Sequence, residues 1–268
     1  MRRFDLANPL PDAALVAMLA PERHRVILSL LADLGRLETN DLQSRLQVSP
    51  ATLRRDIASL ANRGLLKRTH GGVLPCEFSL REPPYEQKAA RAANAKARLG
   101  QRAVALMPMH GVVFIDGGTT CLEVGRALLD RPKLQVFTNS VPLLALAGEA
   151  RATLVGIGGA VRPLSLSLTG ALAQSWLEHL NFDVAVVGCS GIQPDRGPAT
   201  ADLSDAALKA EVLRRARQRI LVAHAGKWGQ PATLVYAPWK AFTHVVTDHV
   251  LTHDQKSHLA AAGVGMNR

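Results

Sequence analysis

Three polar or glycine-rich turns each follow a short apolar run, and their residue types suit the binding of an anion. The turns are Asp116-Gly117-Gly118-Thr119-Thr120, Thr138-Asn139-Ser140 and Gly158-Gly159. The first turn opens a predicted helix, where backbone N–H groups and the positive end of the helix dipole favour a phosphate or carboxylate. Thr119 and Ser140 could instead cap helices, the commoner role of a single such residue. Recurrence at three successive strand ends favours a ligand site.

A second group of residues, in the amino-terminal third of the chain, suits contact with DNA. Ser49 can cap a helix that begins at Pro50, because proline is tolerated in a first helical turn. Gly64 suits a left-handed stop, so the helix should end near Asn62 or Arg63.

The apolar spacing of this helix decides which side chains point outward. Leu53, Ile57 and Leu60 recur at helical spacing and form the buried stripe. The residues off that stripe, together with the cap, are candidate DNA contacts: Ser49, Thr52, Arg54 and Arg55.

A shorter helix over residues 40–46 precedes this helix, joined to it by a tight turn. The run Leu-Leu-Lys-Arg-Thr-His, followed by Gly71 and Gly72, predicts a two-stranded ribbon. A helix presented in this way enters the major groove, and Lys67, Arg68 and His70 on the ribbon could reach phosphates. Two short helices with surface arginines also occur in folds that bind no DNA, so the pattern alone leaves both interpretations open.

The remaining elements are predicted from periodicity and proline placement. Residues 22–34 should form a helix, prolines 75, 83 and 84 mark a linker, and residues 86–107 predict one long basic helix. From residue 111 onward, apolar strands alternate with helical stretches, which predicts a mostly parallel sheet with helices on both faces. Ligands of such sheets bind at the strand carboxyl ends. The predicted strands are VVFID, LQVFT, ATLVGI, FDVAVVG, RILVA and THVVT.

Composition favours two domains and a polyanionic partner. A chain of 268 residues with 47% hydrophobic content can bury a sizeable core, and its net charge is +10. Basic residues exceed acidic ones by four in residues 21–73 and by four in residues 81–102. Cys76, Cys121 and Cys189 are too few for a disulfide framework and lack zinc-site spacing, which fits a reducing cytoplasm. Neither a signal peptide nor an apolar run of about 20 residues is present, so no membrane partner is expected.

Two stretches, VSPATLRRDI and GLLKRTHGGV, together resemble the amino-terminal module of DeoR-family transcriptional regulators. The resemblance extends over roughly residues 21–250, because the three turns and residues 188–192, 202–209 and 227–229 look like the DeoR sensor domain, which is similar to sugar-phosphate isomerases. It implies a phosphate held by residues 116–120 and 138–140, with Lys209 and Lys227 contributing positive charge. Each lysine could otherwise be a solvated surface cation.

Two departures from the family pattern bear on catalysis. The chain has Gly188-Cys189-Ser190-Gly191 where the family commonly has Gly-x-Asp-Gly, and His224 and Gly226 where Asp and Ser commonly precede the last lysine. An isomerase needs a positioned acid or base, usually a carboxylate, and Ser190 cannot supply one. The sequence therefore favours a binding protein with no catalytic residue. The alternative is a sugar-phosphate isomerase-like enzyme with an accessory nucleic-acid-binding module.

Other motifs give weak signals, and no cofactor or metal is predicted from them. Gly156-Ile157-Gly158-Gly159 has Val161 where a dinucleotide fingerprint needs glycine. Cys189 and Ser190 lack the Gly-x-Ser-x-Gly spacing of a nucleophile elbow, so they are interpreted as a strand-end turn. Three histidines near the carboxyl end have no accompanying carboxylate pattern: His244, His249 and His253.

The predicted fold class is α/β, with a small winged helix-turn-helix domain followed by a mostly parallel α/β sensor domain. The domains are an amino-terminal extension (1–20), the DNA-binding domain (21–73), a linker (74–85) and the effector-sensing domain (86–268). We expect a bacterial cytoplasmic regulator, nucleoid-associated when bound to double-stranded DNA, that acts as a repressor and responds to a phosphorylated sugar or related metabolite. One reading helix covers few base pairs, so a homodimer or homotetramer is expected. Translation could begin at Met1 or at Met18.

Overall fold

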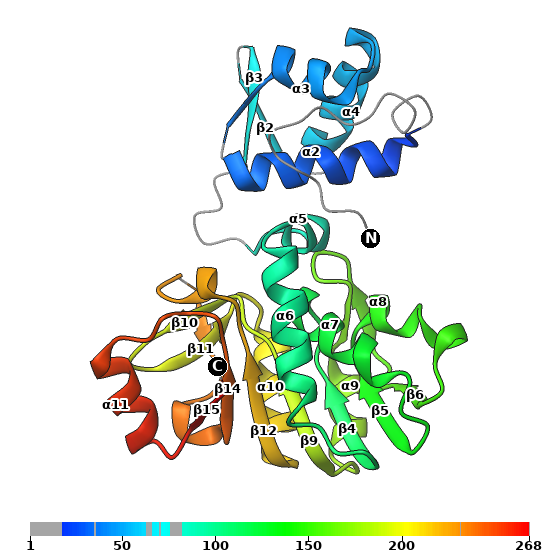
Figure 1. The fold of residues 1–268 in the computed structure, drawn as a ribbon. Helices are drawn as coiled ribbons and strands as arrows, with labels where there is room; N and C mark the ends of the chain where they lie inside the picture. The colour runs from blue at the N-terminus through cyan, green and yellow to red at the C-terminus, as the bar shows by residue number, and fades with distance from the viewer. Residues whose placement is uncertain are drawn as a thin grey trace. The chain divides into compact units, whose positions relative to one another are not determined.

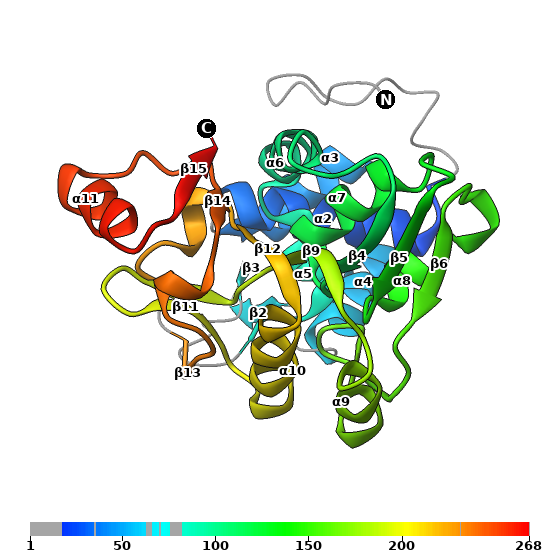
Figure 2. The same ribbon diagram turned by 90° about the horizontal axis from the view of Figure 1, so that it is seen from below.

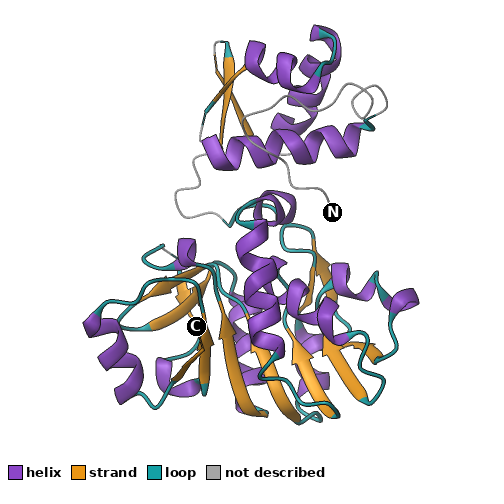
Figure 3. Cartoon of the chain, viewed as in Figure 1, coloured by secondary structure: helices purple, strands orange, loops and turns teal. Residues whose placement is uncertain are grey.

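The computed structural model describes residues 18–34, 36–62, 66–69, 71–75, 82–230 and 232–267. These residues form two compact units (Figures 1 and 3). The first unit contains the described residues before 76 together with Glu86–Arg91, and the second contains residues 82–85 and the chain from Ala92 onward. Residues 86–91 therefore group with the first unit, whereas the sequence predicted that the second domain begins at residue 86.

In the first unit, the described residues before 76 pack three helices against a small antiparallel sheet. Its predicted helices and ribbon are confirmed. The structure adds one strand that was not predicted, because its two residues are too few to show an alternation of apolar and polar side chains. The sheet order is β1-β3-β2. The elements are α2 (Ala20–Leu34), β1 (Leu37–Glu38), α3 (Thr39–Leu46), α4 (Pro50–Asn62), β2 (Leu66–Thr69) and β3 (Gly72–Pro75). The core includes the fully or almost fully buried Ile27, Leu31, Leu42, Leu46, Leu53 and Leu60.

The prediction of one long helix over residues 86–107 was wrong, because the structure has two helices there. They are α5 (Tyr85–Ala90) and α6 (Ala93–Val104). Ala92 separates them with a φ of 52°, in the left-handed region, where the i to i−4 hydrogen-bond ladder cannot continue. High helix propensity in an alanine-rich stretch is only a weak indication, which tertiary context overrides at this residue.

The second unit is built on one parallel sheet of seven strands in the order β15-β14-β12-β9-β4-β5-β6. Every adjacent pair in this sheet is parallel, and all six predicted strands are confirmed. The strands are β4 (Gly111–Ile115), β5 (Leu134–Thr138), β6 (Thr153–Gly156), β9 (Phe182–Val187), β12 (Ala216–Val222), β14 (His244–Val246) and β15 (Gly265–Asn267).

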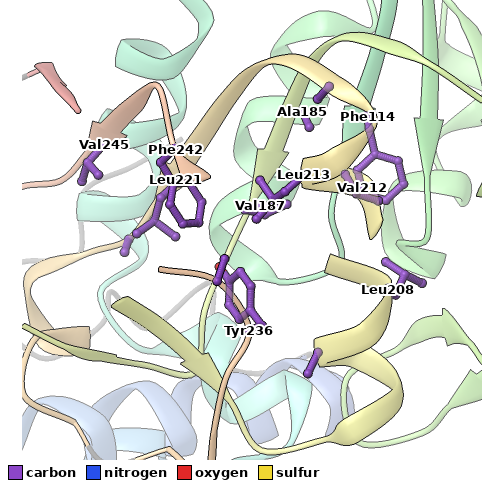
Figure 4. Close-up of a cluster of buried hydrophobic side chains, with 14 of the residues drawn as sticks. Phe114, Ala185, Val187, Leu208, Val212, Leu213, Leu221, Tyr236, Phe242 and Val245 are labelled. Atoms are coloured by element: carbon purple, nitrogen blue, oxygen red, sulfur yellow. The ribbon is translucent and has the colours of Figure 1, made fainter. Parts of the chain in front are cut away.

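Helices cover both faces of this sheet, as predicted. Figure 2 shows α6 and α7 (Thr119–Leu128) on one face and α9 (Ala171–Leu177) and α10 (Leu203–Arg214) on the other. Consecutive strand residues point to opposite faces, so Val113 and Ile115 join the core beneath α6 and α7, whereas Phe114 joins the core beneath α10. Figure 4 shows the α10 core, in which Leu208 and Val212 lie close to Phe114.

Short elements connect and flank the main sheet. Strands β7 (Ala160–Arg162) and β8 (Ser167–Thr169) form an antiparallel hairpin, and β10 (Gly191–Gln193), β11 (Gly197–Thr200) and β13 (Leu234–Val235) form a second small sheet. The short helices are α8 (Val141–Leu144), η1 (Ala147–Glu149), η2 (Ala225–Lys227), η3 (Trp239–Ala241) and α11 (His253–Ala261). Within the described residues, none of the helices is both long and apolar enough to cross a bilayer.

Candidate functional site

The exposed face of α4 has the composition that the sequence predicted. Ser49 Oγ accepts a hydrogen bond from the Thr52 N–H at 3.2 Å, which confirms Ser49 as the helix cap. Leu53 is fully buried on the inner side, and Arg54 and Arg55 are exposed on the outer side. Contact of these arginines with DNA stays a prediction. Gly64, the predicted helix stop, lies outside the described residues.

An ion pair that the sequence analysis missed fixes α4 against α2. The Arg23 guanidinium donates to both carboxylate oxygens of Asp56, at 2.8 and 3.1 Å, and His24 Nε2 lies 3.1 Å from the same carboxylate. The hydrogen bond to Asp56 raises the pKa of Arg23. Because Asp56 directly follows Arg55, this pairing orients the turn of α4 that carries the two exposed arginines.

The ribbon next to this helix also exposes its basic residues. Strands β2 and β3 pair antiparallel, with Lys67 opposite Leu74 and Arg68 opposite Val73. The side chains of Lys67 and Arg68 are exposed, so they are available to a phosphate backbone. His70, the third predicted contact on the ribbon, lies outside the described residues.

In the second unit, the carboxyl ends of β4 and β5 are joined by side-chain hydrogen bonds. The Thr138 hydroxyl donates to the Ile115 carbonyl at 2.6 Å, and the Gly117 N–H donates to Asn139 Oδ1 at 2.6 Å. The structure thus brings together two of the three predicted turns, residues 116–120 and residues 138–140.

Helix α7 begins at this point without a side-chain cap. Gly118 is the residue before its first turn, with a φ of 125°, and no side chain caps the helix start there. Ser140 does cap α8, accepting from the Leu143 N–H at 3.3 Å. The capping interpretation therefore holds for Ser140 but not for Thr119. The first N–H groups of α7 remain suited to an anion.

The Asn139 side chain has one unsatisfied donor. Asn139 is fully buried, and its Nδ2 has no hydrogen-bond partner among the described residues. Because Oδ1 accepts from Gly117, the orientation of the amide is fixed and Nδ2 must be the donor. A buried donor without a partner costs about 1–3 kcal/mol. Asn139 Nδ2 is therefore a candidate donor to a ligand oxygen.

The β7–β8 hairpin packs directly on Asn139, which the sequence analysis did not anticipate. The Leu168 N–H donates to the Asn139 carbonyl at 2.7 Å. A Cβ placed on Gly117 would lie 2.8 Å from Ser167 Cβ and 3.6 Å from Asn139 Nδ2, so position 117 requires glycine. Ser165 and Ser167 share a hydrogen bond at 2.6 Å. Their alternation with leucine in LSLSLT was the available sequence signal for a strand.

Lys209 belongs to the same site, but its charge is already balanced. Its Nζ donates to Asp116 Oδ1 and Oδ2 at 2.9 and 2.7 Å, and to Asp205 Oδ1 at 2.7 Å. Burial alone would lower the pKa of Lys209, but the two carboxylates outweigh it and raise that pKa. The prediction that Lys209 supplies positive charge to a phosphate needs correction, because its ammonium group is buried and faces two acidic groups.

The Gly188–Gly191 turn, which follows β9, contacts Asp116 from the neighbouring strand end. Asp116 Oδ2 accepts from the Gly188 N–H at 2.9 Å, and Tyr236 Oη donates to the Gly188 carbonyl at 2.8 Å. Lys227 Nζ donates to the Ser190 carbonyl at 3.2 Å, so Lys227 lies beside the turn. Burial raises the pKa of Cys189 to about 12, which keeps it a thiol at neutral pH. This supports its interpretation as a turn residue and not a nucleophile.

Gly158 and Gly159 are accounted for by the fold. Both have positive φ values, 76° and 109°, and a Cβ on Gly159 would lie 2.6 Å from the Thr169 carbonyl. These two glycines therefore allow the chain to enter β7 close to β8. This backbone requirement is enough to explain why glycine stands at both positions.

The carboxy-terminal histidines have separate surroundings. His249 stacks on Trp228, with ring centroids 4.7 Å apart, and His244 Nδ1 lies 3.0 Å from the Thr243 hydroxyl. In the part of the chain that the structure describes, no group of three or more His, Cys, Asp or Glu side chains could hold a metal ion.

The two units together define a class of protein, a winged helix-turn-helix module followed by a parallel α/β domain with a polar site at its strand ends. Two family models match the chain, one described as the DeoR-like helix-turn-helix domain over residues 23–77 and one as the DeoR C terminal sensor domain over residues 91–249. The chain belongs to the DeoR family of transcriptional regulators.

Named relatives agree with this assignment. The HTH-type transcriptional regulator GlpR of Haloferax volcanii is 32% identical over 92% of this chain and 97% of the relative. The glycerol-3-phosphate regulon repressor of Escherichia coli is 28% identical over 85% of this chain and 90% of the relative. Among solved structures, ribose 5-phosphate isomerase A from Methanocaldococcus jannaschii covers 51% of this chain and 54% of its own at 15% identity, with a TM-score of 0.38, which is too weak to support an argument.

Proposed function

We propose that this regulator is a repressor that leaves its DNA when a small phosphorylated metabolite binds at the carboxyl ends of β4 and β5. The observation that carries the proposal is the buried Asn139 Nδ2, which lacks a partner among the described residues and lies beside the uncapped start of α7. A phosphate at the α7 start and a hydroxyl or carbonyl oxygen near Asn139 would satisfy both features.

Several neutral groups would hold such a ligand. The N–H groups of Gly118, Thr119 and Thr120 would bind the phosphate, and the hydroxyls of Ser165 and Ser167 lie on the hairpin beside Asn139. Lys227, whose ammonium group donates to the Ser190 carbonyl, would contribute positive charge from beside the Gly188–Gly191 turn. Two relatives are named glycerol-3-phosphate regulon repressors, which supports a small phosphorylated ligand.

The arrangement supports a binding protein over an isomerase. The Asp116 carboxylate in the site accepts from Lys209 and from the Gly188 N–H, so it is committed to structural contacts. The turn at Gly188–Gly191 offers Cys189 and Ser190 where proton transfer would need a carboxylate. We therefore propose that the protein releases its ligand unchanged. As a regulator that binds DNA, it would act in the cytoplasm.

On the DNA side, we propose that α4 enters the major groove and that the β2–β3 ribbon contacts phosphates. The candidate contacts are Ser49, Thr52, Arg54, Arg55, Lys67, Arg68 and His70. One recognition helix covers few base pairs, so two copies of the chain would bind half-sites about one helical turn apart or a multiple of it.

Binding and release can be measured on the full chain with DNA that the protein itself selects. DNA fragments would first be isolated from a random pool by their binding to the protein. Three- to six-carbon sugar and polyol phosphates, glycerol 3-phosphate among them, would then be tested for thermal stabilisation and for release of the selected DNA. Each compound's unphosphorylated counterpart serves as its control, since a ligand that prefers the folded state raises stability by mass action.

We expect at least one phosphorylated compound, but not its counterpart, to stabilise the protein and to release DNA. Asn139→Asp keeps an acceptor for the Gly117 N–H but removes the Nδ2 donor, so this variant should lose the response. Ser175→Ala, on the exposed side of α9, is the matched control and should respond normally. The proposal fails if no compound releases DNA from wild-type protein, or if a compound is isomerised during the assay.

A further inference from the structure

A buried ion pair joins the linker to the β7–β8 hairpin. Glu82 lies in the linker, is 8% exposed, and accepts a hydrogen bond from Arg162 Nη1 at 2.6 Å. Arg162 is the last residue of β7, and its Nε lies 3.2 Å from Asp202 Oδ2. One guanidinium therefore contacts the linker and the cap of α10 at the same time.

The same end of the hairpin also lies against the candidate ligand site, because Arg162 pairs directly with Ser167 across the two strands. Ser167 opens β8, bridges to Ser140, and lies beside the position of Gly117. Between the two strands, Leu166 has a φ of 50°, in the left-handed region that a leucine rarely adopts. Strained residues of this kind are found where a segment has two arrangements, and this one lies within five residues of Arg162.

Access to Asn139 requires this hairpin to move. Asn139 Nδ2 is buried, and the hairpin contacts residue 139 through the Leu168 N–H. A ligand oxygen within hydrogen-bonding distance of Nδ2 would therefore have to displace side chains that surround it, and the hairpin is the element packed on that side. A displaced hairpin carries Arg162 with it.

We propose that the β7–β8 hairpin transmits ligand occupancy to the linker, with the Arg162–Glu82 pair as the contact that is made in one state and broken in the other. This inference rests on the proposed function. Arg162 suits such a role because it has two carboxylate partners of unequal exposure, 7% for the Glu82 side chain and 29% for that of Asp202. When the Glu82 contact breaks, Asp202 still pairs with Arg162, so the guanidinium is never left buried without a partner.

Asp202 also connects this contact to the ion cluster of the site. Its carboxylate caps α10 by accepting from the Asp205 N–H at 2.8 Å, and Asp205 pairs with Lys209, which pairs with Asp116. The linker carboxylate and the ligand loop are thus joined by two routes, one through the hairpin backbone and one through ion pairs on either side of the Asp202–Asp205 hydrogen bond.

Hydrogen exchange on the full chain without ligand tests the contact itself. Glu82→Gln should accelerate exchange several-fold in residues 160–169, because the hairpin loses its anchor to the linker. Glu211→Gln is the matched control, since Glu211 is about equally buried and pairs with Arg214 and Arg215 at the end of α10. This variant should leave exchange in residues 160–169 unchanged. Arg162→Lys keeps the charge but cannot bind two carboxylates in a fork, so it should reproduce the Glu82→Gln result. Unchanged exchange in residues 160–169 of both variants would overturn the inference.

Exchange with saturating glycerol 3-phosphate tests transmission. Wild-type protein should change in residues 116–120, 160–169 and 82–90, whereas Glu82→Gln should change only in the first two. The release of selected DNA by the same ligand should fall in Glu82→Gln towards no release, a loss of about 5- to 150-fold in coupling. If residues 82–90 respond equally in both proteins, the hairpin does not transmit the signal. If residues 116–120 of the wild type do not respond, glycerol 3-phosphate does not bind at the site, and the ligand-free experiment decides the inference.

Discussion

Replacement of Lys209 by methionine should destabilise the second unit strongly, although the two side chains have similar lengths. The variant leaves Asp116, which is fully buried, without the ammonium group that contacts both of its oxygens. It also removes one cation that pairs with Asp205, but that carboxylate is only partly buried and still accepts from the Thr200 hydroxyl. The main cost therefore arises at Asp116.

The size of this effect follows from the burial of the pair. Removal of one partner from a buried ion pair costs about 3–5 kcal/mol, because the other charge remains uncompensated. For a unit of this size, each kcal/mol lowers the melting temperature by about 2–4 °C, so the expected loss is roughly 6–20 °C. Asp116→Asn in the Lys209→Met background removes the uncompensated charge and should recover more than half of the free energy.

Tryptophan fluorescence measures this unit alone, because all three tryptophans of the chain lie in it: Trp176, Trp228 and Trp239. Urea titrations followed by fluorescence would give the free energy of unfolding of wild type, single variants and double variant. An unchanged midpoint in Lys209→Met would refute the ion cluster as a stabilising feature. A double variant less stable than Lys209→Met would show that Asp116 contributes through its Gly188 contact instead.

The dependence of this effect on pH has a definite sign. Burial raises the pKa of Asp116 above its ordinary value of 3.8, and loss of Lys209 can only raise it further. A carboxyl with a raised folded pKa destabilises the protein above that pKa, and the destabilisation disappears as the pH falls through it. The difference between Lys209→Met and wild type should therefore be largest near pH 7 and shrink towards pH 4. A difference that grows on acidification would contradict this reasoning.

Three further predictions concern the first unit. Arg54→Ala or Arg55→Ala should weaken binding of selected DNA by about 1–3 kcal/mol if the lost contact is to a base edge, while circular dichroism shows the fold intact. Unchanged binding in both variants would show that α4 is not the recognition helix. Lys67→Ala or Arg68→Ala should weaken binding to all sequences and reduce the slope of log affinity against log salt by about one, whereas a sequence-selective loss would place these residues at bases. Asp56→Ala should destabilise this unit by about 1.5–3 kcal/mol through loss of its hydrogen bonds to Arg23, seen as earlier proteolysis, while the fluorescence transition stays at the wild-type midpoint.

Local patterns in the sequence were sufficient for most of the architecture. The inner strands β4 and β9 are mostly buried between helices on both faces, so each is a nearly continuous apolar run in the sequence. The edge strand β6 is only partly buried, but its run of apolar residues was still visible. Helix α4 was equally visible, because its cap at Ser49 and its stripe of Leu53, Ile57 and Leu60 all lie within one short segment. In both cases the information that specifies the element is contained within it.

The candidate site could be predicted only in part, because its key contacts join residues far apart in the chain. Lys209 and Asp116 are 93 residues apart, and no local pattern indicates that the lysine is buried against that carboxylate. The same is true of Arg162 and Glu82, which are 80 residues apart. The break at Ala92 was missed for a different reason, since helix propensity favours alanine there and tertiary packing decides otherwise.

The balance of charge in the site bears on which ligands can act as inducers. Lys209 is paired with Asp116 and Asp205, so the α7 dipole, equivalent to roughly half an elementary charge, is the positive charge that remains at Gly118 itself, with Lys227 beside the Gly188–Gly191 turn. If the proposed function holds, inorganic phosphate would occupy the α7 start without reaching Asn139, so it would not displace the hairpin. It should therefore slow exchange in residues 116–120 without releasing DNA, whereas a phosphorylated polyol should do both. Release of DNA by inorganic phosphate alone would show that the Asn139 donor is not part of the switch, and that occupancy of the helix start is sufficient.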